Sequence, residues 1–165
     1  MGIRVLGIDP GTAIMGFGLV EKNRDKLNMM EYGCWRTSAD LSLPERLLSL
    51  YDTLCAFLDT HKPDHLAVES LFFNRNTKTA LIVGQARGVV LLAGAQKGPR
   101  IAEYTPLQVK QAVVGYGKAD KKQVQYMVKA ILGLSKTPQP DDAADALAIA
   151  ICHANSLHNG SPKIY

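Results

Sequence analysis

Two acidic residues end short apolar runs of this 165-residue chain. Asp9 closes the run 3–9 and is followed by a Pro-Gly-Thr turn, which lets a ligand approach the backbone closely. Glu69 closes a similar run at 65–69. A carboxylate at the end of a buried strand is unfavourable unless hydrogen bonds, an opposite charge or a metal ion compensate it. Because a single such acid is more often a turn residue than a catalyst, the two must be judged together with other acids.

A third acidic group, Asp141, Asp142 and Asp145, falls in the first turn of an alanine-rich helix expected at 141–157. The 142/145 and 141/145 spacings each put two carboxylates on one helix face. Acids at a helix start also stabilise the helix dipole, which explains this group taken alone. If the strand ends and the helix start converge, however, the repelling carboxylates favour Mg²⁺ or Mn²⁺, which prefer oxygen ligands. Two such ions about 4 Å apart activate water and stabilise the leaving oxygen in phosphodiester hydrolysis.

Basic residues are concentrated in one segment. The formal net charge is only +4, but residues 70–125 contain nine basic and two acidic side chains, while the remainder has ten basic and thirteen acidic ones. A basic segment beside an acidic remainder suits a polyanionic partner such as a nucleic acid. A solvated helix surface has the same composition, and charge alone slightly favours that explanation.

Composition disfavours several classes of protein. With 47% hydrophobic and 21% charged residues, the chain resembles a soluble globular protein and not a disordered one. No apolar run approaches the roughly 18 residues of a membrane helix, so no membrane partner is expected. Three widely spaced cysteines form no disulfide framework or zinc pattern, and we expect buried thiols in a reducing compartment at Cys34, Cys55 and Cys152.

The periodicity of apolar residues predicts an α/β chain without repeats or linkers. Strands are expected at 3–9, 14–21, 26–36, 65–69 and 100–104, and helices at 43–62, 77–97, 106–114, 120–132 and 141–157. Three early strands followed by alternating helices and strands indicate a mixed sheet with helices packed against it. Glycine destabilises a helix, so close packing is expected where helix 77–97 contains Gly84, Gly88 and Gly94.

These motifs resemble the RuvC family of bacterial Holliday-junction resolvases. The similar segments, in the family's order and over about residues 3–157, are Gly7-Ile8-Asp9-Pro10-Gly11-Thr12, Glu69, Gly84-Gln85-Ala86-Arg87-Gly88, Val109-Lys110-Gln111 and Asp142-Ala143-Ala144-Asp145-Ala146-Leu147-Ala148. The resemblance implies one ribonuclease H-like nuclease domain at 1–158 and a flexible tail at 159–165. Its α/β fold would have a five-stranded mixed sheet with helices on both faces.

The resemblance also implies the active site. The catalytic and metal-binding carboxylates would be Asp9, Glu69, Asp142 and Asp145, with two Mg²⁺ ions per site, Mn²⁺ as a substitute and Asp9 between the ions. The family has Asp or His at the first helical position, and spacing does not separate Asp142 from Asp141. Alignment on Asp-Ala-Ala-Asp selects Asp142 and leaves Asp141 to cap the helix.

The resemblance further implies a set of DNA contacts. Phe72 matches an aromatic residue that stacks on an unpaired junction base, a contact of about 1–3 kcal/mol. Phe73 is equally explained as a core residue. Lys110 and Lys121 match basic residues near the scissile phosphate, although a solvated helix face would also explain them. The full expected set is Phe72, Phe73, Arg75, Lys78, Lys110, Lys118, Lys121 and Lys122.

The implied protein is a bacterial, cytoplasmic homodimer that binds four-way junction DNA and cuts it by two symmetric nicks in homologous recombination and DNA repair. Its products would carry 5′-phosphate and 3′-hydroxyl ends, and its implied partner is the RuvA–RuvB branch-migration complex. Helix 77–97 is the candidate dimer surface, although one face of it must pack on the sheet.

Three other functions share parts of this pattern. Actin-like proteins and sugar kinases also begin with Asp-x-Gly-Thr, but they need two related domains and are far longer. A ribonuclease H-like nuclease that processes ribosomal RNA shares the strand that bears Asp9, but it should lack the Asp-Ala-Ala-Asp ending together with a basic middle. A non-catalytic junction-binding module would have lost an acid, and every expected acid is present.

Overall fold

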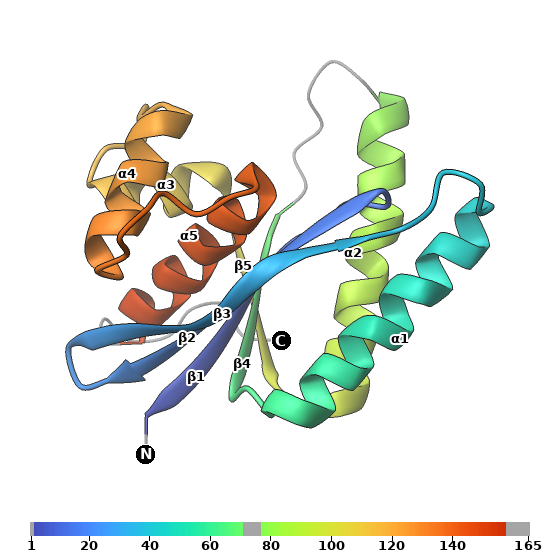
Figure 1. Cartoon of the computed structure of the whole chain (residues 1–165), viewed down its shortest axis with the longest axis horizontal. Helices are drawn as coiled ribbons and strands as arrows, with labels where there is room; N and C mark the ends of the chain where they lie inside the picture. Colours follow the sequence, from blue (N-terminus) through green and yellow to red (C-terminus); the bar gives the residue numbers. More distant parts are fainter. Residues whose placement is uncertain (1, 71–76, 158–165) are drawn as a thin grey trace.

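A five-stranded sheet lies at the centre of the fold (Figure 1). The computed structural model describes residues 2–70 and 77–157, so the expected tail at 159–165 lies outside the described residues. In chain order the elements are β1 (Ile3–Asp9), β2 (Ile14–Asn23), β3 (Lys26–Arg36), α1 (Leu43–His61), β4 (His65–Glu69), α2 (Thr77–Lys97), β5 (Arg100–Tyr104), α3 (Pro106–Val114), α4 (Lys121–Ile131) and α5 (Asp141–Ser156). Each expected strand and helix is present, with ends within two residues of those expected.

The sheet is mixed, as the element order predicts. Its strand order is β3-β2-β1-β4-β5, with antiparallel pairing of β1–β2 and β2–β3 and parallel pairing of β1–β4 and β4–β5. Ile8 pairs with Val68, so the two parallel strands end side by side. The acids that follow, Asp9 and Glu69, therefore lie at the same edge of the sheet.

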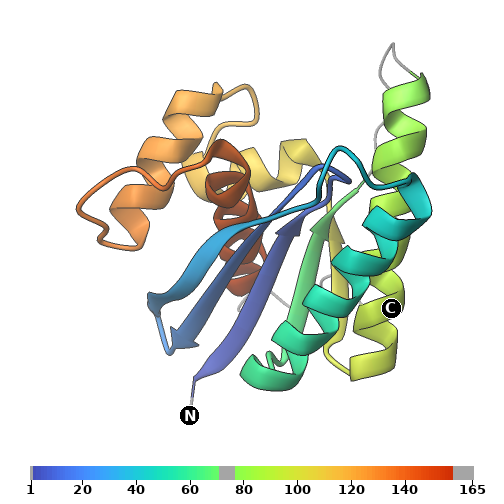
Figure 2. The ribbon, with the colours of Figure 1, turned by 45° about the vertical axis from the view of Figure 1, so that its right-hand side comes forward.

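Helices cover both faces of the sheet. In Figures 1 and 2, α1 and α2 lie on one side, and α5 lies on the other side with α3 and α4 beyond it. The sheet has a hydrophobic core on each face, and alternating residues of β1 belong to one or the other. Leu6 and Ile8 pack with α1 and α2, whereas Val5 packs with α5. Since side chains alternate along a strand, Asp9 shares the α5 face with Val5.

The start of α5 packs directly against the backbone of β1 and β2 at two glycines. A Cβ atom added at Gly7 would lie 2.1 Å from the carbonyl oxygen of Ala146, and one added at Gly16 would lie 2.1 Å from the carbonyl oxygen of Asp142. Only a residue without a side chain fits such distances. The two glycines therefore let the acidic turn of α5 approach Asp9.

The helix α2 differs from expectation in two respects. It is long and apolar enough to cross a membrane, with a mean hydropathy of 1.2 over its most apolar 18-residue stretch, of which 28% is buried. Length and composition alone are weak evidence for a span, but the expectation that no segment would pass this test is wrong. Gly94 packs closely against Leu66 and Ile101, as expected, whereas Gly88 faces open space.

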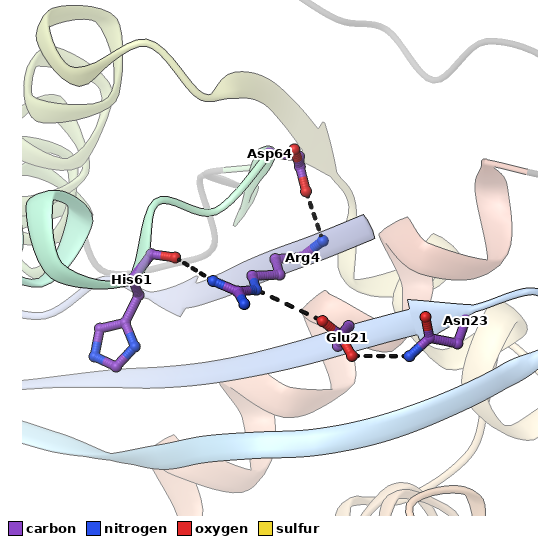
Figure 3. Close-up of polar contacts among 5 residues, drawn as sticks. All are labelled: Arg4, Glu21, Asn23, His61 and Asp64. Carbon is purple, nitrogen blue, oxygen red and sulfur yellow. Dashed lines mark hydrogen bonds and ion pairs between the residues drawn. The ribbon is translucent and has the colours of Figure 1, made fainter. Parts of the chain in front are cut away.

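A polar cluster ties the opposite edge of the sheet together (Figure 3). The Arg4 backbone N–H donates to Oδ2 of Asp64 at 2.8 Å, and Nη1 of Arg4 donates to the carbonyl oxygen of His61 at 3.0 Å. Nε of Arg4 lies 3.6 Å from Oε1 of Glu21, which belongs to a carboxylate that also accepts a hydrogen bond from Asn23. These contacts join β1 to β2, to the end of α1 and to the turn before β4.

His153 is a buried histidine that should make folding sensitive to acid. Its side chain is fully buried on α5, and its Nδ1 lies 2.7 Å from the hydroxyl of Tyr104. Burial, together with the charges of His65 and Lys22, lowers the pKa of His153 to about 4. An unfolded histidine titrates near 6.5, so the unfolded chain takes up the proton first as the pH falls.

We expect the His153 contribution to stability to be complete above about pH 6.5 and to disappear as the pH falls toward 4. The difference between the pKa values of His153 in the folded and unfolded chain corresponds to roughly 3 kcal/mol of unfolding free energy. Urea unfolding at several pH values should show a smaller loss of stability in acid for His153→Gln than for the wild type, because the titrations of groups that do not interact with His153 cancel in the difference. Parallel pH profiles for the two proteins would contradict this assignment.

Candidate active site

Acidic side chains from three elements line one cavity at the edge where β1 and β4 end. Asp9 ends β1, Glu69 ends β4, and Asp145 projects from the second turn of α5. The cavity has a volume of about 270 Å³ and is lined by Asp9, Glu69, Pro106, Val109, Lys110, Lys121, Val124, Asp145 and Ala148. Three carboxylates and two ammonium groups therefore surround a pocket whose remaining wall is apolar.

The carboxylates of this cavity resist ionisation. Burial raises the pKa of Asp9 to about 7, and the charges of Asp145, Glu69 and Asp142 add to this effect, while Lys121 opposes it. Burial and the charge of Asp145 raise the pKa of Glu69, against the effect of Lys110. Burial likewise raises the pKa of Asp145, while the charge of Lys121 and its contact with Asp145 lower it. A site with this excess of negative charge favours the binding of a cation.

The structure separates the two candidates at the start of α5. Asp142 is half-buried beside Gly16, and its charge acts on Asp9. Asp141 is exposed, and hydrogen bonds from Lys121 and Gln125 lower the pKa of its carboxyl. Asp142 does not line the cavity itself, but its charge raises the pKa of both Asp9 and Asp145. The charge of Asp141 also acts on Asp145, but its side chain contacts Lys121 and Gln125 of α4.

Two helix starts carry the lysines to the cavity. The side chain of Thr105 caps α3 by accepting from the backbone of Gln108, and Lys110 follows in the next turn. Asp120 caps α4 through the backbone of Gln123 and places Lys121 at the first helical position. Both residues that the resemblance assigns to the scissile phosphate thus lie beside the carboxylates.

Three of the other expected DNA contacts are described by the structure, and none of the three lines the cavity. Lys78 is exposed at the start of α2, and Lys118 is exposed between α3 and α4. Lys122 is exposed and lines a separate surface pocket together with Tyr126. The remaining three, Phe72, Phe73 and Arg75, lie outside the described residues.

Two neighbours of the cluster were not foreseen from the sequence. Cys34 of β3 pairs with Gly16, and burial and the charges of Asp142 and Asp9 raise the pKa of its thiol, while Arg36 opposes them. This pair depends on a register shift between Leu19 and Val20 as well as on the hairpin between β2 and β3, and the positions of the strands alone do not reveal it. Like Cys55, Cys34 is half-buried, so only the third cysteine, Cys152, is fully buried as expected.

The donors fit a divalent cation by their chemistry. Asp9, Glu69, Asp142 and Asp145 offer only carboxylate oxygens, the ligands that Mg²⁺ prefers, and burial together with the neighbouring negative charges raises the pKa of Asp9, Glu69 and Asp145. Within residues 2–70 and 77–157, no three acidic, histidine or cysteine side chains lie close enough together to form a complete metal site.

The chain is similar to known proteins over nearly its whole length. The family model described as "Crossover junction endodeoxyribonuclease RuvC" matches residues 5–153. Proteins of that name from Desulfitobacterium hafniense and Pelotomaculum thermopropionicum are 64% and 58% identical, covering 93% and 92% of this chain and 93% and 92% of their own lengths. A solved structure, "T. thermophilus RuvC in complex with Holliday junction substrate", superposes with a TM-score of 0.93 at 38% identity and covers 99% of each chain.

Proposed function

This chain belongs to the RuvC family of crossover junction endodeoxyribonucleases, and we propose that it resolves four-way Holliday junctions by paired symmetric nicks in homologous recombination and DNA repair. Its α/β fold is ribonuclease H-like. The observation that carries the proposal is the convergence of Asp9, Glu69 and Asp145 beside two lysines in one cavity. Its structural relative from T. thermophilus is complexed with a Holliday junction substrate, which supports the same substrate here.

In this proposal the four carboxylates, Asp9, Glu69, Asp142 and Asp145, hold two Mg²⁺ ions, for which Mn²⁺ can substitute. Bound divalent ions supply an activated water and stabilise the leaving oxygen of a phosphodiester. A central place for Asp9 is supported by its pKa, which the charges of the three other carboxylates all raise. Lys110 and Lys121 neutralise the phosphate that enters the cavity, as ammonium groups do for nucleic-acid backbones.

The apolar wall of the cavity excludes water and does not contribute a reactive group. Val109, Val124 and Ala148 line the pocket and are buried in the core shared by α3, α4 and α5. They limit the entry of bulk water, which strengthens the electrostatic interactions of the carboxylates and lysines with the phosphate. Hydrolysis of the P–O3′ bond by water would leave a 5′-phosphate and a 3′-hydroxyl.

We further propose a homodimer, so that two equivalent cavities cut two equivalent strands. The exposed apolar residues Leu81 and Leu92 of α2 mark its candidate surface, together with Leu48 of α1. The DNA would also contact Lys78, Lys118 and Lys122, and the residues outside the described ranges, Phe72, Phe73 and Arg75. The proposed setting is the bacterial cytoplasm, with the RuvA–RuvB branch-migration complex as partner.

Incubation with a synthetic four-way DNA junction, a linear duplex and a structured RNA, each with and without Mg²⁺, tests the proposal. We expect Mg²⁺-dependent cleavage of the junction alone, at symmetric positions, and ligase should seal the nicks because their ends are 5′-phosphate and 3′-hydroxyl. Equal cleavage of all three substrates, or preferential cleavage of RNA, would refute junction resolution. Nicks that ligase cannot seal would refute the proposed chemistry.

A further inference from the structure

Asp141 lies outside the catalytic cavity but contacts a lysine that lines it. Oδ2 of Asp141 lies 3.3 Å from Nζ of Lys121, and Oδ1 accepts a hydrogen bond of 2.9 Å from Nε2 of Gln125. Lys121 and Gln125 are four residues apart on α4, so they lie on the same helix face. One turn of α4 therefore engages both carboxylate oxygens of Asp141.

The ammonium group of Lys121 bridges two carboxylates, of which one lines the cavity and the other does not. Nζ also lies 3.3 Å from Oδ2 of Asp145, which belongs to the cavity with Asp9. Any cation that binds Asp145 competes with Lys121 for that carboxylate. The contact with Asp141 does not compete in this way, because Asp141 does not line the cavity.

We propose that Asp141, anchored by Gln125, is a positioning residue that holds the Lys121 ammonium at the rim of the cavity for the phosphate of the scissile strand. This inference rests on the proposed function, because it explains how one of its phosphate-binding lysines is kept in place. The side chains of Lys121 and Asp141 are both 53% exposed, so the contact is worth little for stability. The contact instead restricts the long Lys121 side chain, which otherwise has many rotamers.

Two other roles for Asp141 predict different behaviour. As a charge at the start of α5, it would act on the helix dipole. As a metal ligand, it would change the Mg²⁺ concentration required for cleavage. The helix-dipole role does not pass through Lys121, so a double-mutant cycle between Asp141 and Lys121 distinguishes it from positioning. The metal-ligand role is distinguished by the Mg²⁺ requirement, which positioning leaves unchanged.

The test measures single-turnover cleavage of a four-way junction for the wild type, Asp141→Asn, Lys121→Gln and the double variant. We expect Asp141→Asn to lower the rate about two- to fivefold, the size of one exposed ion pair. In the Lys121→Gln background it should have no further effect. Junction affinity measured in EDTA should not weaken in Asp141→Asn, because the substitution removes a negative charge near a polyanion.

Matched variants complete the test. Asp141→Asn should keep its full effect in a Lys122→Gln background, since Lys122 forms no ion pair with either carboxylate among the described residues. Gln125→Ala, which removes only the anchor, should lower the rate in the same direction and only while Lys121 is present. An Asp141→Asn effect that persists without Lys121, or that appears as a changed Mg²⁺ requirement, would overturn the inference. Failure of the wild type to cut the junction would instead overturn the proposed function.

Discussion

Asp142→Asn should abolish junction cleavage, with a loss of at least about a hundredfold, while junction binding is retained. The substitution keeps the size of the side chain and removes one of the charges that act on Asp9. A cluster that has lost this carboxylate holds divalent ions less well, so hydrolysis fails. DNA binding persists because the lysines are unchanged and one repelling charge is gone. Single-turnover cleavage in Mg²⁺ and junction binding in EDTA measure the two effects separately.

Asp141→Asn is the matched control for this prediction. It makes the same chemical change one residue earlier in the same helical turn, but Asp141 contacts Lys121 and Gln125 of α4. Asp141→Asn should therefore show only the few-fold loss of cleavage rate that is expected when this contact is removed. A second readout is the pKa of Asp9 in the metal-free protein, which should fall in Asp142→Asn more than in Asp141→Asn. Loss of cleavage in Asp141→Asn with an active Asp142→Asn would reverse the assignment.

Sequence patterns foresaw the elements of the site better than the distances between them. The apolar runs that end at Asp9 and Glu69 define β1 and β4, and both acids lie at one sheet edge because the two strands are parallel. The helical period could not separate Asp141 from Asp142, since each lies within one turn of Asp145. Only the packing of α5 on the sheet decides which of them is directed toward Asp9.

That packing depends on residues with no chemistry of their own. Gly7 and Gly16 admit the α5 backbone, and the alanines of α5 leave no bulk to hold it away. In the sequence, a glycine within a strand is ambiguous, because it indicates a bulge as readily as a close approach. Cys34 and Arg36 were missed for a related reason: the register of β3 on β2 brings Cys34 beside Gly16, where the charge of Asp142 acts on its thiol, and Arg36 acts on the same thiol.

Gly16→Ala should therefore inactivate the protein without touching any reactive group. The added Cβ atom would lie 2.1 Å from the carbonyl oxygen of Asp142 and 3.1 Å from its Cβ atom, so the start of α5 must move. A shift of about 1 Å in a catalytic group can lower the rate about a hundredfold. We expect a loss of that order in single-turnover cleavage, and a decrease of about 1–3 kcal/mol in unfolding free energy from overpacking.

Two other glycine substitutions separate displaced acids from a weakened fold. A Cβ atom at Gly18 would meet the side chain of Leu147 at 2.7 Å, in the same helix but one turn further from Asp142. That Cβ atom would also lie 2.9 Å from the backbone Cα atom of Leu147, so Gly18→Ala should lower stability to a similar extent. Its loss of cleavage should be smaller, because the part of α5 that must move lies further from Asp142. Gly33→Ala would contact only the ring of Phe17 on the opposite face of the sheet, at 3.1 Å, and should keep its activity.

If Gly16→Ala were folded and as active as Gly33→Ala, the backbone contact would not be what positions the acids of α5. If all three variants lost cleavage in proportion to stability, activity would depend on the general integrity of the sheet and not on the position of Asp142.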